Sequence, residues 1–272
     1  MSCQPERRLR SLSVRVGLAD TGTLLGYADL AWSGWRSVGS VLAEWGMAGV
    51  EALREQASVL VIVDVLSFST AVDVAASRGA AVFPFPYGDK VAAQTAADRV
   101  GAALAQPRQA AGGQLSLSPS SLLSVSAGTK LMLPSPNGSR LSLAGGGTPV
   151  MAGCLRNAAA VARAAREMAG GGIVGVVPVG ERWPDGSLRP AIEDLLGAGA
   201  IVHHLGLPCS PEAQVARDAF RSAGPDLPRL IQASTSGCEL VERGFHRDVE
   251  IAVETEVSAC VPLLIGDAYR NL

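Results

Sequence analysis

The sequence alternates short apolar segments with amphipathic segments rich in small residues, and this alternation constrains the fold more than any other feature. Residues 59–63 read VLVIV, and apolar residues then recur at helical spacing through residues 68–76. A second apolar run, GAAVFPF, follows at residues 79–85. Strands that alternate with helices predict an α/β fold, in which a largely parallel or mixed sheet lies between two layers of helices. We therefore expect a three-layer α/β/α architecture.

Two further units of the same kind follow along the chain. The predicted strand TPVMAG precedes a helix capped by Asn157, and the predicted strand IVGVVPV precedes the loop GERWPDGSLR and a helix that begins near Pro190. On that helix Ile192, Leu195 and Leu196 are expected to face inward. The segment AIVHHL after it is predicted to be another strand, and the segments DKVAAQTAADRVGAALA and SPEAQVARDAFRSAG are predicted to be helices.

The composition is suited to one large buried core and disfavours several classes of protein. Of the 272 residues, 48% are hydrophobic and 18% are charged, so disorder is not expected over most of the chain. The net charge of -2 and the aromatic content of 4% disfavour a nucleic-acid-binding surface. No apolar run approaches the roughly 18 residues that a membrane span needs. We expect neither a nucleic-acid partner nor membrane association.

Residues 1–40 differ from the rest of the chain because they show only weak periodicity. We predict that they form an N-terminal extension and that residues 41–272 form the α/β domain. The basic start of the chain lacks the apolar region of a secretory signal. The five cysteines are widely spaced and include no C-x-x-C, which indicates reduced thiols in the cytoplasm. A homo-oligomer is compatible with the sequence, which does not specify an oligomeric state.

Unusual polar side chains follow the predicted strands, at the edge where sheets of this kind bind ligands. Asp64 ends the first strand, the loop SPNGSR at residues 135–140 follows a later one, and GER at residues 180–182 follows another. The residues expected to bind phosphate or substrate are Ser67, Ser69, Thr70, Asn137, Gly138, Ser139, Arg140 and Arg182.

This combination of anion-binding groups and acids predicts phosphate chemistry. Hydroxyl groups and backbone N–H groups at helix N-termini bind anions. Carboxylates at the same rim would repel a phosphate unless a cation lies between them. Two or three acidic groups completed by water suit Mg²⁺, and we expect Asp64, Glu193 and Asp194 to hold it. The sequence thus indicates metal-assisted phosphoryl chemistry on a small phosphorylated substrate.

Each of these features also has an ordinary structural interpretation. Asp64 could cap a helix, and Asn-Gly pairs are common in turns. A helical wheel places Asp194 nearly opposite the apolar stripe of its helix and Glu193 on the flank, where residues are often solvated. His203 and His204 follow the predicted strand AIV and are interpreted as structural. A non-catalytic anion-binding protein is the alternative to an enzyme, and the chain has neither a P-loop nor a G-x-S-x-G motif.

Several ordered motifs resemble one family of phosphatases. The segments VIVDVLSFSTAVDVAASRGA, LPSPNGSRL, AGCLRNAAAVA, VPVGERWPDGSLRPAIEDLLGAGAIV and VPLLIGDAYRN together resemble the 2-phosphosulfolactate phosphatase family, the ComB-like proteins. The resemblance spans roughly residues 58–272, with EWGMAGVEAL as its leading edge. It implies a ComB-like α/β fold and a Mg²⁺-dependent phosphatase. The reaction it implies converts 2-phosphosulfolactate to sulfolactate and phosphate, a step toward coenzyme M.

The resemblance also implies roles for particular residues. It places the family's strand-end aspartate on Asp64, its hydroxyl pair on Ser69 and Thr70, and its later asparagine on Asn157. Its Asn-Gly-Thr loop corresponds to residues 137–139, its Glu-Asp pair to residues 193–194, and a further matching position is Asp248. From these correspondences we predict Asp64, Asn157 and Glu193 as the catalytic residues.

One departure from the family pattern bears on the substrate. Family members often read Asp-Val-Leu-Arg-Ala-Ser-Thr, whereas this chain reads Asp-Val-Leu-Ser-Phe-Ser-Thr and has Ser67 at the arginine position. An arginine there could bind a sulfonate or phosphate through two hydrogen bonds, and a serine cannot. Arg140, Arg156 and Arg182 are the candidates to replace it. A different small phosphomonoester therefore remains an alternative substrate.

Overall fold

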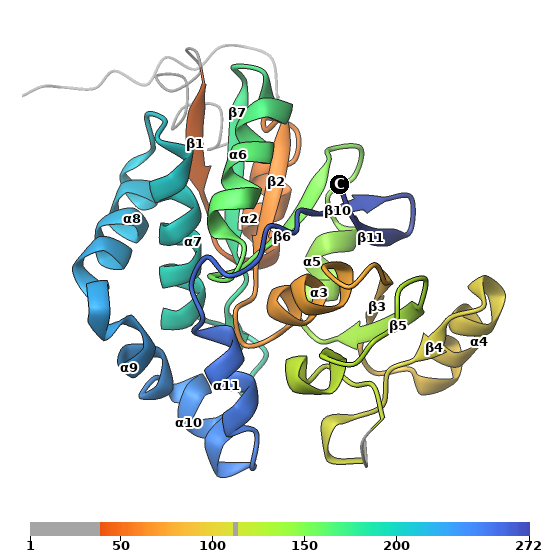
Figure 1. The fold of residues 1–272 in the computed structure, drawn as a ribbon. Helices are drawn as coiled ribbons and strands as arrows, with labels where there is room; N and C mark the ends of the chain where they lie inside the picture. The colour runs from red at the N-terminus through yellow and green to blue at the C-terminus, as the bar shows by residue number, and fades with distance from the viewer. Residues whose placement is uncertain (1–38, 111–113) are drawn as a thin grey trace, which may run out of the picture. The chain divides into compact units, whose positions relative to one another are not determined.

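The apolar segments predicted as strands lie side by side in a sheet flanked by helices (Figure 1). The computed structural model describes residues 39–110 and 114–272, which belong to one compact unit. The strands are β1 (Ser40–Ala43), β2 (Val59–Val63), β3 (Ala81–Pro86), β4 (Ala103–Leu104), β5 (Lys130–Ser135), β6 (Val150–Gly153), β7 (Ile173–Pro178), β8 (Glu181–Arg182), β9 (Leu188–Arg189), β10 (Pro262–Ile265) and β11 (Ala268–Asn271).

The helices alternate with these strands through most of the chain and follow one another after β9. They are α2 (Gly46–Leu53), α3 (Phe68–Ala76), α4 (Lys90–Val100), α5 (Gly138–Leu143), α6 (Ala158–Ala169), α7 (Ile192–Leu205), α8 (Pro211–Ala223), α9 (Leu227–Gln232), α10 (Thr235–Glu242) and α11 (His246–Ala252). Three short 3₁₀ segments are η1 (Arg108–Ala110), η2 (Pro119–Leu122) and η3 (Gly224–Asp226).

The main sheet of the described residues is mixed and has the order β1-β7-β2-β6-β10-β11-β3-β5-β4. The strands β1, β7, β2 and β6 run parallel to one another, and so do β3, β5 and β4. The C-terminal hairpin β10–β11 pairs antiparallel with both blocks and joins them. Three antiparallel pairings, β6 with β10, β10 with β11 and β11 with β3, separate the two blocks, so the blocks run in opposite directions. The twist of roughly 20–25° at each strand step turns one block across the other, which allows strand ends from both to meet.

The larger parallel block has helices on both of its faces. Val59, Val61 and Val63 of β2 belong to a buried cluster with α6 and α7. Leu60 points to the other face of the sheet. A β-carbon added at Gly175 of β7 would contact both Leu60 and Leu53 of α2, so these two leucines lie close together. Alternate residues of one strand therefore contact opposite helical layers, as a sheet buried on both faces requires. The three-layer α/β/α architecture is confirmed.

The segment AIVHHL is helical, and its prediction as a strand is wrong. Residues 200–205 are the last turns of α7, so His203 and His204 lie near a helix end. The predicted inward face of α7 is confirmed at Leu196, which is buried, and is wrong at Ile192. Ile192 is 44% exposed, whereas Glu193 and Asp194 are only 2% and 3% exposed. The helix turns its two acids, and not Ile192, toward the protein interior.

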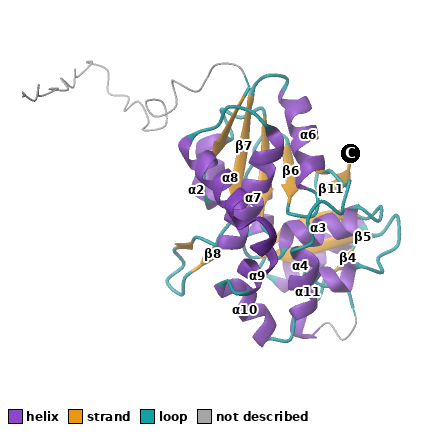
Figure 2. Cartoon of the chain, turned by 60° about the vertical axis from the view of Figure 1, so that its left-hand side comes forward, coloured by secondary structure: helices purple, strands orange, loops and turns teal. Residues whose placement is uncertain are grey.

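Two smaller features differ from the sequence analysis. The predicted loop at residues 180–189 contains the hairpin β8–β9, which Figure 2 shows extending outward beyond the end of β7. Ser67 and Asn157 occupy N-cap positions, but neither side chain accepts a capping hydrogen bond there. The predicted N-terminal extension lies outside the described residues, apart from its last two positions. No described helix has both the length and the apolar character of a membrane span.

Candidate active site

Asp64 lies directly after β2, where the strand gives way to α3. Its side chain is 8% exposed, and its Oδ1 accepts a hydrogen bond from the backbone N–H of Phe68 at 3.0 Å. This bond satisfies one of the free N–H groups at the start of α3, so Asp64 caps the helix, whereas Ser67 occupies the N-cap position without a capping bond. Its second oxygen, Oδ2, faces Gly138 at the start of α5, where an added β-carbon would lie only 2.7 Å away.

The hydroxyl groups of Ser69 and Thr70 stabilise the Asp64 loop. Ser69 Oγ accepts from the backbone N–H of Asp64 at 3.1 Å and donates to the carbonyl of Ile62 at 2.9 Å. Thr70 Oγ1 donates to the carbonyl of Val65 at 2.7 Å. Both side chains are fully buried. Their hydrogen bonds hold the carboxylate of Asp64 in place, and their binding of phosphate stays a prediction.

The first turn of α7 brings two carboxylates to the same place. Asp194 Oδ1 accepts from the backbone N–H of Val65 at 2.7 Å, and its Oδ2 accepts from that of Gly180 at 2.8 Å. Asp194 therefore ties the loop after β2 to the loop after β7. Glu193 is also buried, and its Oε2 has no hydrogen-bond partner among the described residues. A buried carboxylate oxygen without a partner is costly, which makes Glu193 the acid most in need of a ligand.

A third strand end reaches this cluster through an amide. Asn137, which follows β5, donates from Nδ2 to Glu181 Oε2 at 2.9 Å and accepts at Oδ1 from Arg182 Nε at 3.3 Å. All three residues line a cavity of about 150 Å³ that also includes Trp45. Glu181 was not among the predicted site residues. Its position directly after a buried strand was the signal that pointed to it.

Burial and mutual repulsion alter the acidity of this cluster. Burial raises the pKa of Asp64 to about 6, although the Phe68 N–H and Arg108 act in the opposite direction, and Glu193 adds to the rise. Burial, followed by the charges of Asp64 and Glu193, raises the pKa of Glu181 to about 7. The same three causes raise the pKa of Asp194 well above its usual range. Asp64 and Glu181 therefore exchange protons close to neutral pH, and a bound cation would favour their ionised forms.

Four other predicted residues lie in or near these loops with local contacts of their own. Ser139 Oγ donates to the carbonyl of Leu133, and Gly138 lies against Asp64. Arg140 is exposed on α5, and no hydrogen bond or ion pair of the described residues joins it to the cluster. Asn157 is fully buried after β6, where its amide bonds to the backbone of residues 154 and 152. The catalytic role of Asn157 stays a prediction.

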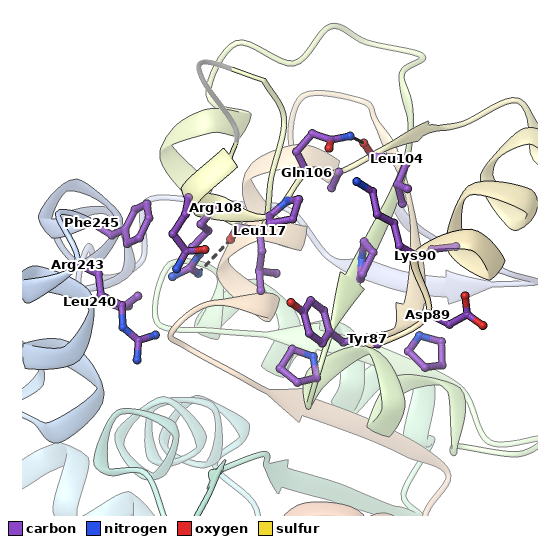
Figure 3. Close-up of a pocket in the computed structure, with 18 residues that line it drawn as sticks. Tyr87, Asp89, Lys90, Leu104, Gln106, Arg108, Leu117, Leu240, Arg243 and Phe245 are labelled. Carbon is purple, nitrogen blue, oxygen red and sulfur yellow. Dashed lines mark hydrogen bonds between the residues drawn. The ribbon is translucent and has the colours of Figure 1, made fainter. Parts of the chain in front are cut away.

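Arg108, from η1, is the residue that approaches Ser67. Its Nη2 donates to Ser67 Oγ at 2.6 Å and to the carbonyl of Leu117 at 3.2 Å. None of the arginines considered as replacements does so, since Arg156 pairs with Asp73 and Glu254. No sequence motif marks Arg108, and the short strand β4 that precedes it lies within a segment predicted to be a helix. Only the tertiary structure brings it to Ser67, and Figure 3 shows its side chain near Leu117 and Phe245.

Asp248, at the start of α11, also lies close to this guanidinium. Its Oδ1 accepts from Ser118 Oγ at 2.6 Å and from the backbone N–H of Ser120 at 3.1 Å. Its Oδ2 is buried and has no partner among the described residues. Burial lowers the pKa of Arg108, and the charges of Asp248, Asp64 and Glu181 oppose that shift. Arg108 thus lies between the carboxylate cluster and a second buried acid.

Comparisons with known proteins bear directly on these residues. A family model described as 2-phosphosulpholactate phosphatase matches residues 49–267, most of the chain. The chain belongs to the 2-phosphosulpholactate phosphatase family. A probable 2-phosphosulfolactate phosphatase of Pseudothermotoga lettingae is 34% identical over 80 residues, which are 29% of this chain and 36% of that relative. The chain therefore aligns with little more than a third of that relative's length. The family indicated by the sequence motifs is confirmed.

The donor set of this family member suits a hard cation such as Mg²⁺. The described part of the chain contains no group of three or more His, Cys, Asp and Glu side chains arranged to hold a metal ion. Mg²⁺ does not require such a group, since it commonly binds one or two carboxylates and keeps several waters. Asp64 and Glu193 can supply those carboxylates, and Glu193 Oε2 is free of hydrogen bonds. Asp194 already accepts a backbone hydrogen bond at each oxygen, and its role as a metal ligand stays a prediction.

Proposed function

We propose that the protein is a Mg²⁺-dependent phosphatase that hydrolyses the phosphate ester of a small acid, with 2-phosphosulfolactate as the favoured substrate. Membership of the 2-phosphosulpholactate phosphatase family supports the reaction class and the substrate. The proposed reaction yields sulfolactate in the cytoplasm, as a step toward coenzyme M. The four cysteines of the described residues are free, which agrees with a reducing compartment.

The observation that carries this proposal is the cluster of buried acids at the end of β2. Asp64 and Glu193 are both nearly inaccessible, and each contributes to the electrostatic environment of the other. Removing two carboxylates from water costs several kcal/mol for each ion unless a counter-charge is present. A divalent cation would provide that charge and would also attract a phosphate. The cluster is therefore explained better by a bound cation than by a structural role alone.

In the proposed hydrolysis, the oxygen of a water attacks phosphorus and the ester P–O bond breaks. The leaving alkoxide takes up a proton, so that an ester and a water give an alcohol and inorganic phosphate. Glu181 is suited to supply this proton because its pKa of about 7 keeps much of it protonated at neutral pH. Asn137 fixes the orientation of that carboxyl group through its bond to Oε2.

The other residues of the site would bind and orient the reactants. Asp64 and Glu193 would hold Mg²⁺, which when bound neutralises phosphate charge and lowers the pKa of a nearby water. Arg182 lies at the rim, with Nε on Asn137 and Nη1 on the carbonyl of Gly186, and presents a positive charge toward the small cavity. Asp194 would position Asp64 by holding the backbone of the loop that follows it.

Phosphate release tests the proposal directly. The purified protein should release phosphate from 2-phosphosulfolactate in the presence of Mg²⁺ and lose that activity in EDTA, with recovery on adding Mg²⁺ back. Asp64→Asn should lower kcat by at least about 100-fold, because it removes a charge from the reaction centre. Exchange of the exposed Asp267 for Asn is the matched control and should leave kcat unchanged. A well-folded protein that releases no phosphate from 2-phosphosulfolactate or phospholactate with Mg²⁺ would refute the proposal.

A further inference from the structure

A cavity of about 300 Å³ lies beside the carboxylate cluster, and Arg108 lines it (Figure 3). The guanidinium of Arg108 packs over the ring of Phe245, with 5.5 Å from its carbon to the ring centroid. Two donors of its Nη2 are used by Ser67 and Leu117, whereas Nε is buried without a partner among the described residues. A guanidinium has five N–H donors, so Arg108 is held firmly and still has donors left for a ligand.

The charges that line this cavity favour an anion. Lys90 and Arg243 line it together with Arg108, and neither takes part in an ion pair among the described residues. Asp89 is the acid of the lining, and its carboxylate accepts the N-cap hydrogen bond of α4 from Ala92. In Figure 3 Arg243 and Phe245, from the turn between α10 and α11, lie on one side of the cavity and Lys90 lies on the other. Cations from separate elements of the fold thus surround one space.

The cavity also adjoins the residues proposed to act on phosphate. Pro134 and Pro136 line it and immediately precede Asn137, which contacts Glu181. Arg108 is bonded to Ser67, in the loop that begins at Asp64, and the charge of Asp64 acts on its pKa. The cavity is therefore bounded by segments that lead directly to Asp64 and Asn137.

We propose that Arg108 selects the substrate by binding a second anionic group, a carboxylate or a sulfonate, in this cavity while the phosphate lies at Asp64 and Glu193. The inference rests on the proposed function for the position of the phosphate. A planar guanidinium binds such groups through two parallel hydrogen bonds. Apolar side chains, including Leu104, Leu117 and Leu240, also line the cavity, and a less polar environment strengthens such bonds. Phosphate esters without a second acid group would gain no binding energy from Arg108 in this cavity.

A purely structural role for Arg108 makes a different prediction. If Arg108 only balanced the charges of Asp64 and Asp248, its loss would weaken the site for every phosphate ester to the same extent. A loss of activity that is confined to substrates with a second acid group requires that Arg108 contact that acid group itself. The two roles are therefore separated by comparing substrates with and without a second anion, and by measuring the binding of a product that has no phosphate.

The experiment compares wild type with Arg108→Gln, Arg108→Lys and the control Arg99→Gln, which alters an exposed arginine of α4 outside the cavity. Titration calorimetry with sulfolactate should show Arg108→Gln weakening binding about 10- to 100-fold, Arg108→Lys recovering part of it, and Arg99→Gln behaving as wild type. In phosphate-release assays, Arg108→Gln should raise the KM for 2-phosphosulfolactate about 10- to 100-fold, and the KM for glycerol 2-phosphate, which has no second acid group, by a much smaller factor.

Two outcomes would overturn the inference. One is wild-type protein that does not bind sulfolactate at millimolar concentration, or that binds it equally well after Arg108→Gln. The other is an equal loss of activity toward 2-phosphosulfolactate and glycerol 2-phosphate in that variant. If wild type binds sulfolactate through Arg108 but releases no phosphate from any ester, the proposed function fails and the inference about Arg108 survives.

Discussion

Replacing Gly138 with alanine tests whether the packing around Asp64 controls both stability and activity. An added β-carbon would lie 2.4 Å from Phe68 Cδ1 and 2.7 Å from Asp64 Oδ2. Carbon atoms pack best at about 3.5–4.0 Å, so the methyl group must displace its neighbours by about 1 Å. The ring of Phe68 is fully buried and packs edge-on against Tyr269, with 6.2 Å between ring centroids. It has no free space into which to move.

The structure sets the size of the expected effect. Overpacking of a buried site costs about 1–3 kcal/mol, and each kcal/mol lowers the melting temperature of a domain of this size by about 2–4 °C. Gly138→Ala should therefore lower the melting temperature by about 2–12 °C, measured by circular dichroism or calorimetry. A carboxylate displaced by about 1 Å from its reacting partner should also reduce kcat by about 100-fold.

Gly147→Ala is the matched control, because a β-carbon there meets no atom within 4 Å. It should change neither the melting temperature nor kcat by a measurable amount. Adding Phe68→Leu to Gly138→Ala should restore part of the stability, since the ring contact is relieved, but not the activity, since the contact with Asp64 remains. The reasoning is refuted if Gly138→Ala melts and reacts like Gly147→Ala.

Two further predictions concern stability. The folded-state pKa values of Asp64 and Glu181, about 6 and about 7, exceed the ordinary values of 3.8 and 4.5. In EDTA, which removes metal ions, both groups therefore contribute stability that is fully present below roughly pH 4. That contribution is lost as the pH rises through 6 and 7. Asp64→Asn removes roughly 3 kcal/mol of this pH dependence. The free energy of unfolding in urea should therefore change less between about pH 4 and 7 in the variant than in wild type. An equal change in both proteins would contradict the raised pKa of Asp64. Asp194→Asn puts an amide N–H against a backbone N–H and should cost about 1–3 kcal/mol in thermal unfolding, whereas Asp267→Asn should cost nothing measurable.

The error at the end of α7 shows a limit of reading periodicity. Ala200, Ile201, Val202 and Leu205 are apolar and buried, and a short buried helical segment cannot be distinguished from a buried strand by its pattern. The Gly-Ala-Gly before them, at residues 197–199, resembles a turn between a helix and a strand. In the structure Gly197 and Gly199 allow close helix packing, since a β-carbon would lie 2.6 Å from Val65 and 2.1 Å from the carbonyl oxygen of Ala216. The glycines indicate a helix contact, which only the tertiary structure reveals.

The sequence located the carboxylates of the site better than its hydroxyl groups. Asp64, Asn137 and Glu193 were named because they follow predicted strands or open a helix, and the folded chain does bring their loops together. The hydroxyls of Ser69 and Thr70 follow the same strand, yet both donate to backbone carbonyls. Position at a strand end is fixed by topology, whereas the direction of a short side chain depends on nearby backbone groups that compete for its hydrogen bond.

Arg108 explains how the site tolerates serine at position 67. An arginine side chain at that position would extend from the start of α3, whereas here the guanidinium arrives from η1 and donates to the Ser67 hydroxyl. The positive charge beside Asp64 is therefore kept, but it is carried by a different segment and opens onto a cavity of about 300 Å³. A guanidinium that enters from the far side of a cavity leaves space between itself and the carboxylates. If Arg108 binds the second anion as proposed, the segment that bears it sets the distance between phosphate and second anion that the site accepts, and substrate choice should then depend on that segment more than on the loop after β2.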